Sequence, residues 1–179
     1  MKKFLLLLVM ATGAFTAKSQ SSAYHAFKVD VGFGYAIPSA SGSSTKAGVT
    51  FTIQPHYRVS DDLAVGLRLE GAALAFQTGS SSDDTKVAVL ASYCATGEYY
   101  LMDSGIRPFV GVGAGFFTQS SININNSSYA VPSATKFGFF PEVGIEAGHF
   151  RLSADYDILP DKAGYLAFKI GFFLGGGRK

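Results

Sequence analysis

The chain has 179 residues, enough for one domain of ordinary size, and 47% of them are hydrophobic against 16% charged. Its formal net charge of +2 depends on the first 19 residues: without Lys2, Lys3 and Lys18, 12 basic residues face 13 acidic ones and the net charge is −1. The remaining chain has no basic excess of the kind that binds nucleic acid. Cys94 is the single cysteine, which excludes an intramolecular disulfide.

The first residues are typical of a secretory signal peptide. Two lysines precede a short apolar run, Phe4–Phe15, and small residues in an A-x-A pattern follow at Ala17–Ser19. The apolar run is well under the ~20 residues that a transmembrane helix needs. We therefore expect a signal peptide over residues 1–19, export through the inner membrane, and one β-barrel domain over residues 20–179.

Apolar and polar residues alternate most clearly between Ala47 and Leu69. The apolar set of the first run is Val49, Phe51, Ile53, Pro55 and Tyr57, with polar residues between them. After Ser60–Asp62 the alternation resumes, with Leu67 and Leu69 on one face and Arg68 on the other. A period of two indicates a strand with one apolar face, and two such runs about a polar turn predict a hairpin.

The same alternation recurs to the end of the chain and predicts an all-β fold of eight strands. Their expected bounds are Ala26–Ala36, Ala47–Val59, Leu63–Phe76, Lys86–Leu101, Pro108–Phe117, Thr135–Ala147, Phe150–Ile158 and Tyr165–Leu174. The connections alternate in length: tight ones follow the even strands, and longer ones rich in Ser, Asn and Gly follow the first, third and fifth. Outer-membrane barrels have short periplasmic turns and longer outer loops, so this asymmetry favours an antiparallel up-and-down barrel that crosses the membrane, with periplasmic termini.

A soluble eight-stranded barrel would show the same period of two. Two features favour the membrane. The polar face is rich in glycine, which suits a crowded lumen: Gly32, Gly34, Gly66, Gly111, Gly113, Gly115, Gly138, Gly144 and Gly171. Aromatic residues gather near the expected strand ends, as in the girdles of membrane barrels: Tyr35, Tyr57, Phe76, Tyr99, Tyr100, Phe116, Phe117, Phe150, Tyr156 and Tyr165.

With its leader, its eight strands and the segments RPFVGVGAGFF (Arg107–Phe117) and AFKIGFFLGGGRK (Ala167–Lys179), the chain resembles the small outer-membrane β-barrel superfamily of Gram-negative bacteria, the barrels of the OmpA, OmpX and OmpW kind. The resemblance covers the whole chain after the leader and implies a location in the outer membrane. Many such proteins end in an aromatic residue. This chain instead continues past Phe173 into three glycines, Arg178 and Lys179.

Charged residues on the inward face predict a network of ion pairs inside the barrel. Its expected members are Lys28, Asp30, Arg68, Glu70, Glu142, Glu146, Arg151, Asp155 and Lys169. If Gly148-His149 forms a II′ turn, Glu146 faces Arg151 and Glu142 faces Asp155. The last strand then brings Lys169 beside Asp155. Because an eight-stranded barrel leaves a lumen just wide enough for side chains to fill, we interpret this network as a plug, with a gated polar path as the alternative.

Catalytic and cofactor signals are weak. Neither His56 nor His149 has the His-x-Ser spacing of outer-membrane lipid A deacylases, and no three metal ligands share a recognisable spacing. The glycines of Gly111–Gly115 alternate within a strand, whereas a nucleotide loop needs a strand followed by a helix. We therefore expect no enzyme activity, no cofactor and no metal.

The expected function is structural or surface-binding, with outer-membrane lipid around a monomeric barrel and a surface partner contacted by the long loops. The longest expected loop, Thr118–Ala134, lacks charge and offers the candidate contacts Ile122, Ile124, Tyr129 and Val131. It is also compatible with an extended hairpin above the membrane. A narrow channel for small solutes and a lipid-modifying enzyme are the alternative functions.

Overall fold

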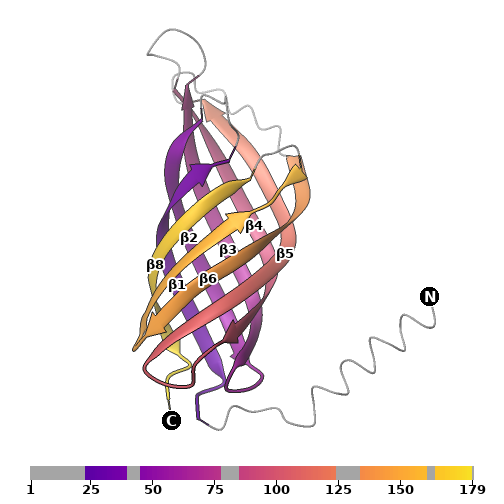
Figure 1. Cartoon of the computed structure of the whole chain (residues 1–179). Coiled ribbons are helices and arrows are strands. Elements are labelled where there is room, and N and C mark those ends of the chain that lie inside the picture. The colour runs from indigo at the N-terminus through magenta and orange to yellow at the C-terminus, as the bar shows by residue number, and fades with distance from the viewer. Residues whose placement is uncertain (1–22, 40–44, 78–84, 124–133, 161–163, 179) are drawn as a thin grey trace, which may run out of the picture.

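In the computed structural model, the described residues 23–39, 45–77, 85–123, 134–160 and 164–178 form one closed antiparallel β-barrel (Figure 1). Its strands are β1 (Phe27–Pro38), β2 (Thr45–Arg58), β3 (Leu63–Gln77), β4 (Thr85–Tyr100), β5 (Ile106–Asn123), β6 (Ala134–Ala147), β7 (Phe150–Asp157) and β8 (Tyr165–Gly175). No helix in the described part of the chain is long and apolar enough to cross a membrane.

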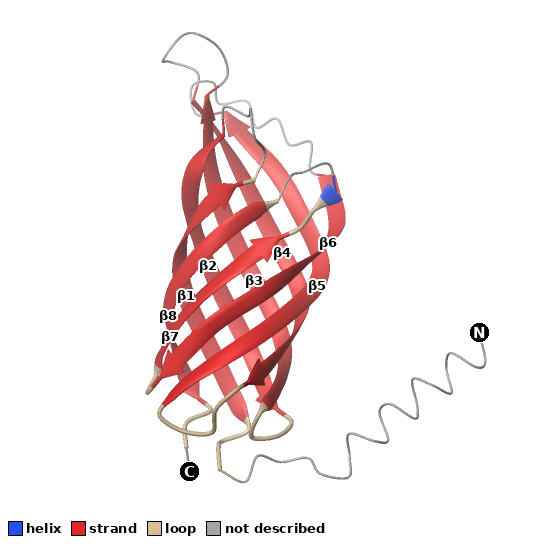
Figure 2. Ribbon diagram, viewed as in Figure 1, coloured by secondary structure: helices blue, strands red, loops and turns tan. Residues whose placement is uncertain are grey.

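Each strand pairs with the next one along the chain, and β8 closes the barrel against β1. The closing register runs from Lys28 opposite Gly175 to Pro38 opposite Tyr165. Closure gives every strand a paired neighbour on both sides and so removes the two edge strands that an open sheet would have. The tight connections and the C-terminus lie at one end of the barrel, which we call the turn end, and the opposite end is the loop end (Figure 2).

Alternation sets the two faces of the wall as the sequence predicts. Leu67 is 55% exposed, whereas the neighbouring Arg68 is fully buried. The same pattern holds for the other strands: large apolar side chains cover the outside of the barrel, and charged side chains point into the lumen. Gly148 has a φ of 60°, as the first residue of a II′ turn requires, and the observed register pairs Glu146 with Arg151.

The strands at the loop end are longer than predicted. β5 continues to Asn123 and pairs with β4 as far as Lys86, so the interpretation of Ile122 as a loop residue is wrong. The main-chain ladder with β4 continues β5 to Asn123, which pairs with Lys86. Ile124, Tyr129 and Val131 lie outside the described residues, as does the expected signal peptide.

Part of the expected aromatic girdle points inward. Tyr100, Phe117 and Tyr165 are buried, whereas Tyr99 and Phe116 are exposed. Neighbouring residues of a strand point to opposite faces, so only one member of Tyr99-Tyr100 or Phe116-Phe117 can face outward. The inward rings pack inside the barrel, where they contribute to the site described next.

Candidate functional site

The lumen contains two clusters of charged and polar side chains. The turn-end cluster consists of Lys28, Asp30, His56, Arg58, Glu98, Tyr100, Glu142, Glu146 and Arg151. The central cluster consists of Thr52, Arg68, Glu70, Asp155, Asp157, Tyr165 and Lys169. Every side chain in both clusters is buried, because the wall of the barrel encloses it on all sides.

Arg151 of β7 is the main cation of the turn-end cluster. Its Nη2 lies 2.5 Å from Glu98 Oε1 and 3.1 Å from Glu142 Oε1, and its Nη1 lies 3.0 Å from Glu146 Oε1. Lys28 Nζ approaches the same Glu146 oxygen to 2.5 Å. These contacts join strands from opposite walls, so the cluster ties the barrel together across its interior.

A hydroxyl, an imidazole and a carboxylate lie in line beside this cation. His56 Nδ1 is 2.8 Å from Asp30 Oδ2, and His56 Nε2 is 3.1 Å from Thr96 Oγ1. Hydrolases use such an order of groups, but only with a substrate site alongside. The cavity that Asp30 lines measures about 20 Å³, room for about one water, so the arrangement orients His56 and offers no space for a substrate.

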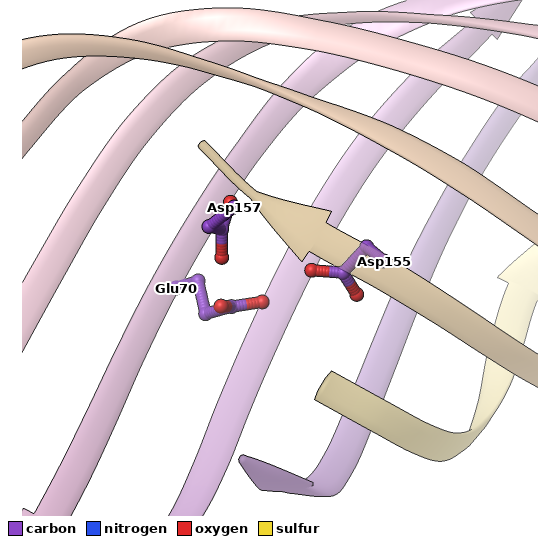
Figure 3. A group of neighbouring side chains, drawn as sticks. All are labelled: Glu70, Asp155 and Asp157. Atoms are coloured by element: carbon purple, nitrogen blue, oxygen red, sulfur yellow. The ribbon is translucent and has the colours of Figure 1, made fainter. Parts of the chain in front are cut away.

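Three carboxylates meet in the central cluster. Ligand oxygens of Glu70 on β3 and of Asp155 and Asp157 on β7 all lie within 4.8 Å of one another (Figure 3). Such a group would suit a metal ion if it were otherwise uncompensated. Two cations of the chain already compensate it: Arg68 lies 3.0 Å from Asp155 Oδ2, and Lys169 Nζ lies 2.7 Å from Glu70 Oε2.

Further contacts complete the central cluster. Arg68 Nη2 lies 2.5 Å from Asp157 Oδ1, and Lys169 Nζ lies 2.5 Å from Asp155 Oδ1. The hydroxyl of Tyr165 donates to Glu70 Oε1 at 2.5 Å. Because Arg68 and Lys169 stand among the carboxylates, a divalent ion there would meet two positive charges. We therefore assign these acids to the ion-pair network rather than to a metal centre.

Towards the loop end the lumen becomes apolar. The buried residues there are Ala36, Ala72, Leu74, Ala88, Leu90, Cys94, Phe117, Phe140, Leu159, Tyr165 and Ala167. The Arg68 guanidinium carbon lies 3.5 Å from the centroid of the Phe140 ring, which joins this layer to the central cluster. The lumen is thus filled by charged side chains in its turn-end and central parts and by apolar side chains beyond them.

All side chains that the sequence assigned to the lumen network lie inside it, and each makes at least one ion pair. Glu142 and Asp155 are opposite, as predicted, and different cations bind them: Arg151 binds Glu142, while Lys169 binds Asp155. Lys169 stands directly opposite Ser153, so its contact with Asp155 is diagonal.

Several members of the network were not singled out by the sequence: Arg58, Glu98, Tyr100, Asp157 and Tyr165. The inward parity of their strands could have revealed all of them. Asp157, for example, is two residues from Asp155 and shares its face. Which residues from distant strands meet cannot be read from parity, because Glu98 and Arg151 belong to β4 and β7.

Comparison with known proteins supports the architecture. The sequence matches the family model of the outer membrane protein beta-barrel domain over residues 4–172. No curated protein matches the sequence.

Solved structures share the fold at low sequence identity. Neisserial surface protein A is 18% identical with a TM-score of 0.61, over 83% of this chain and 96% of that one. OprG from Pseudomonas aeruginosa is 12% identical with a TM-score of 0.55, over 88% and 100%. Ail, the attachment invasion locus protein of Yersinia pestis, is 15% identical with a TM-score of 0.50, over 84% and 99%.

These observations agree on one location. A closed barrel with an apolar outer surface and a charged interior is stable where lipid surrounds it. Since short turns face the periplasm in barrels of this kind, we infer that the turn end is periplasmic and that the loop end faces outward. The chain belongs to the outer membrane protein beta-barrel domain family and is an eight-stranded barrel of the Gram-negative outer membrane.

Proposed function

We propose that this protein is a non-conducting barrel that anchors its outer loops at the cell surface, where they contact a partner. The observation that carries the proposal is the filled lumen. Salt bridges cross it at the turn end and the centre, and Phe117, Phe140 and Leu74 pack beyond them. A solute would have to displace buried ion pairs and rings together, which opposes the channel alternative.

The surface role is supported by the architecture of the protein, in which the barrel is the scaffold and the longer connections lie at one end of it. A rigid scaffold that holds long connections at one end is a common way to build a binding surface. Two of the similar structures are of a surface protein and an attachment invasion locus protein, although at their identities the likeness concerns the fold alone.

Planar-bilayer recording tests the closed lumen. We expect no steady conductance from the refolded protein. Arg151→Ala, which removes a side chain bonded to three carboxylates, should produce brief openings at most, because the apolar layer stays in place. A stable, ion-selective conductance in the unmodified protein would replace this proposal with the channel.

Loop replacement tests the surface role. Residues 124–133 are exchanged for a short Gly-Ser connection, and the adhesion of cells that produce either form to protein-coated surfaces is compared. Heat-modifiable gel mobility reports folding. Retained folding with lost adhesion supports the proposal, whereas unchanged adhesion contradicts it. The matched control shortens residues 78–84 in the same way, which separates an effect of the longest connection from that of any outer loop.

A further inference from the structure

A pocket of about 330 Å³ lies at the periplasmic mouth of the barrel. Its lining includes Arg58, Arg107, Arg178, His149 and a single acid, Glu146. The volume falls at the lower end of the range of small-molecule sites, which runs from about 300 to 1,000 Å³.

The two ends of the described chain build this pocket. Tyr24 forms an isolated antiparallel bridge with Arg178, and the His25 amide donates to the Gly177 carbonyl at 2.9 Å. Gly175 and Gly176 adopt positive φ values of 73° and 60°, which turn the chain out of β8 towards Tyr24. The glycine-rich tail therefore has a structural use, since it brings the Arg178 backbone to the mouth of the lumen.

Arg58 has donors without a partner in the pocket. Its side chain is fully buried, yet within the described structure Nε and Nη1 have no hydrogen-bond partner. Nη2 has only a long contact of 3.5 Å to Glu146 Oε2. Burying polar donors without partners costs free energy, and the cost is larger for a charged group.

The charge around Arg58 is also positive. Arg107 donates from Nε to the Met102 carbonyl at 3.0 Å and from Nη2 to the Asp61 carbonyl at 2.7 Å, and neither acceptor carries a full negative charge. The guanidinium carbons of Arg58 and Arg107 lie 4.6 Å and 4.2 Å from the centroid of the same ring, that of Tyr100. Both guanidinium groups thus pack on one ring, and both line the pocket.

Glu146 alone does not neutralise the positive charge of Arg58 and Arg107, because its Oε1 already contacts two cations of the turn-end cluster. Lys28 Nζ lies 2.5 Å from that oxygen and Arg151 Nη1 lies 3.0 Å from it. The remaining oxygen is the one 3.5 Å from Arg58. Among the described residues that line the pocket, the cationic side chains Arg58, Arg107 and Arg178 therefore outnumber the single acid, Glu146.

We propose that the pocket binds a phosphate group, held by Arg58 and Arg107 with Arg178 at the rim. Guanidinium groups bind phosphate oxygens through charge-assisted hydrogen bonds; a phosphate monoester carries about −1.5 to −2 charges at neutral pH, and the phosphodiester of a phospholipid carries one negative charge. Such a group would supply acceptors to the free donors of Arg58 and would offset the repulsion between the two buried guanidinium groups. The phosphate belongs either to a soluble periplasmic molecule or to a phospholipid headgroup at the same membrane level.

Titration of the refolded protein with inorganic phosphate in a non-ionic detergent, followed by calorimetry, tests this site. We expect saturable binding at one site. Arg58→Gln should weaken it by about tenfold or more, which corresponds to ~1.4 kcal/mol or more. Arg178→Ala should weaken it by a smaller factor because Arg178 is exposed. Lys136→Ala, which removes a positive charge from the opposite end of β6, should leave binding unchanged.

Heat-modifiable gel mobility verifies the fold of each variant, and Arg178→Ala keeps the test decisive if Arg58→Gln fails to fold. Absence of saturable binding, or equal weakening by Lys136→Ala, would overturn the proposal. Phosphatidylglycerol added to the micelles separates the two sources. Competition with inorganic phosphate would support the site and assign it to a headgroup. Phosphate binding that the lipid leaves unchanged would support a site for a soluble phosphate.

Discussion

Glu98 of β4 and Arg151 of β7 meet across the lumen, with Oε1 and Nη2 2.5 Å apart. The two strands are not neighbours in the barrel, so this ion pair joins opposite walls rather than adjacent strands. Both side chains are buried, and Arg151 also binds Glu142 and Glu146. The pair is therefore part of a network in which Arg151 contacts three acids, and Lys28 contacts two of them, Glu98 and Glu146.

Removing that cation should cost more than removing it together with one of its acids. Arg151→Met leaves Glu98, Glu142 and Glu146 poorly compensated and should lower the free energy of unfolding by ~3–5 kcal/mol. The double variant Arg151→Met/Glu98→Gln should lose less, because one buried charge has gone as well. Urea titration with far-UV circular dichroism measures this. If the double variant loses as much stability as the single variants Arg151→Met and Glu98→Gln lose together, Arg151 does not compensate the charge of Glu98.

The outward face gives a prediction that depends on depth in the membrane. Leu69 is 42% exposed and lies near the middle of β3, so Leu69→Arg should destabilise the barrel by ~2–4 kcal/mol in lipid. Leu101, which is 58% exposed at the turn end, is the matched control. There the same change should cost no more than about 1 kcal/mol, because the membrane interface is close. Equal costs in a vesicle refolding titration would contradict the inferred membrane position.

The sequence predicted the strands and their faces because side chains alternate within each strand, whichever strands pair in the barrel. It predicted the contacts of Arg151 with Glu146 for a local reason, since a two-residue turn fixes the register of β6 and β7. The salt bridge from Arg151 to Glu98 has no such local signal. It depends on closure of the whole barrel and on side-chain length, neither of which is visible in the alternation.

The periplasmic pocket was missed for a similar reason. Nothing in the sequence distinguishes Arg58 from other residues at the end of a strand. The tail after Phe173 differs from the family pattern but does not indicate a pocket. The bridge between Tyr24 and Arg178 and the hydrogen bond from His25 to Gly177 show that the two ends of the described chain meet. The loop interpretation of Ile122 failed because composition rich in Ser and Asn does not prevent a strand from continuing along a paired neighbour.

A pair of acids in the periplasmic turns should make stability depend on pH. A side-chain hydrogen bond with Asp103 is the main cause that raises the pKa of Asp62 above its ordinary value of 3.8. A raised pKa in the folded state means that the folded protein binds this proton more tightly. The resulting stabilisation is present below pH 3.8 and is lost as the pH rises through the higher folded pKa.

Asp62→Asn should therefore stabilise the barrel slightly at pH 7 relative to the unmodified protein, and this gain should disappear near pH 3. The gain should stay below about 1 kcal/mol because the turn is largely in water. Asp103→Asn should give the same result, and the double variant should add little to either. Urea titrations at the two pH values measure this, and additive gains would show that the two carboxyl groups do not interact.

Glycines in the lumen make room for aromatic rings on the neighbouring strand. Gly113 of β5 stands opposite Phe140 of β6, and Gly144 of β6 stands opposite Phe109 of β5. A Cβ atom on Gly113 would lie 2.3 Å from Phe140 Cζ, and one on Gly144 would lie 2.4 Å from Phe109 Cζ. Gly113 and Gly144 thus belong to the packing of the lumen, where the Phe140 and Phe109 rings fill the space that a side chain on each glycine would take.

Gly113→Ala should accordingly destabilise the barrel by ~1–3 kcal/mol, because the added methyl group must push Phe140 into an already filled lumen. Gly97→Ala is the matched control: nothing lies within 4 Å of its added Cβ, and the position is on the outer face of β4. Its effect should be neutral or favourable by up to about 1 kcal/mol, since alanine loses less backbone entropy on folding. Thermal melts of both variants by circular dichroism give the comparison.

Gly113→Ala combined with Phe140→Leu should recover part of the stability lost in Gly113→Ala, because the smaller leucine side chain leaves space for the added methyl group. If Gly113→Ala and Gly97→Ala melt together, the ring does not need the glycine and the lumen is looser than its packing indicates.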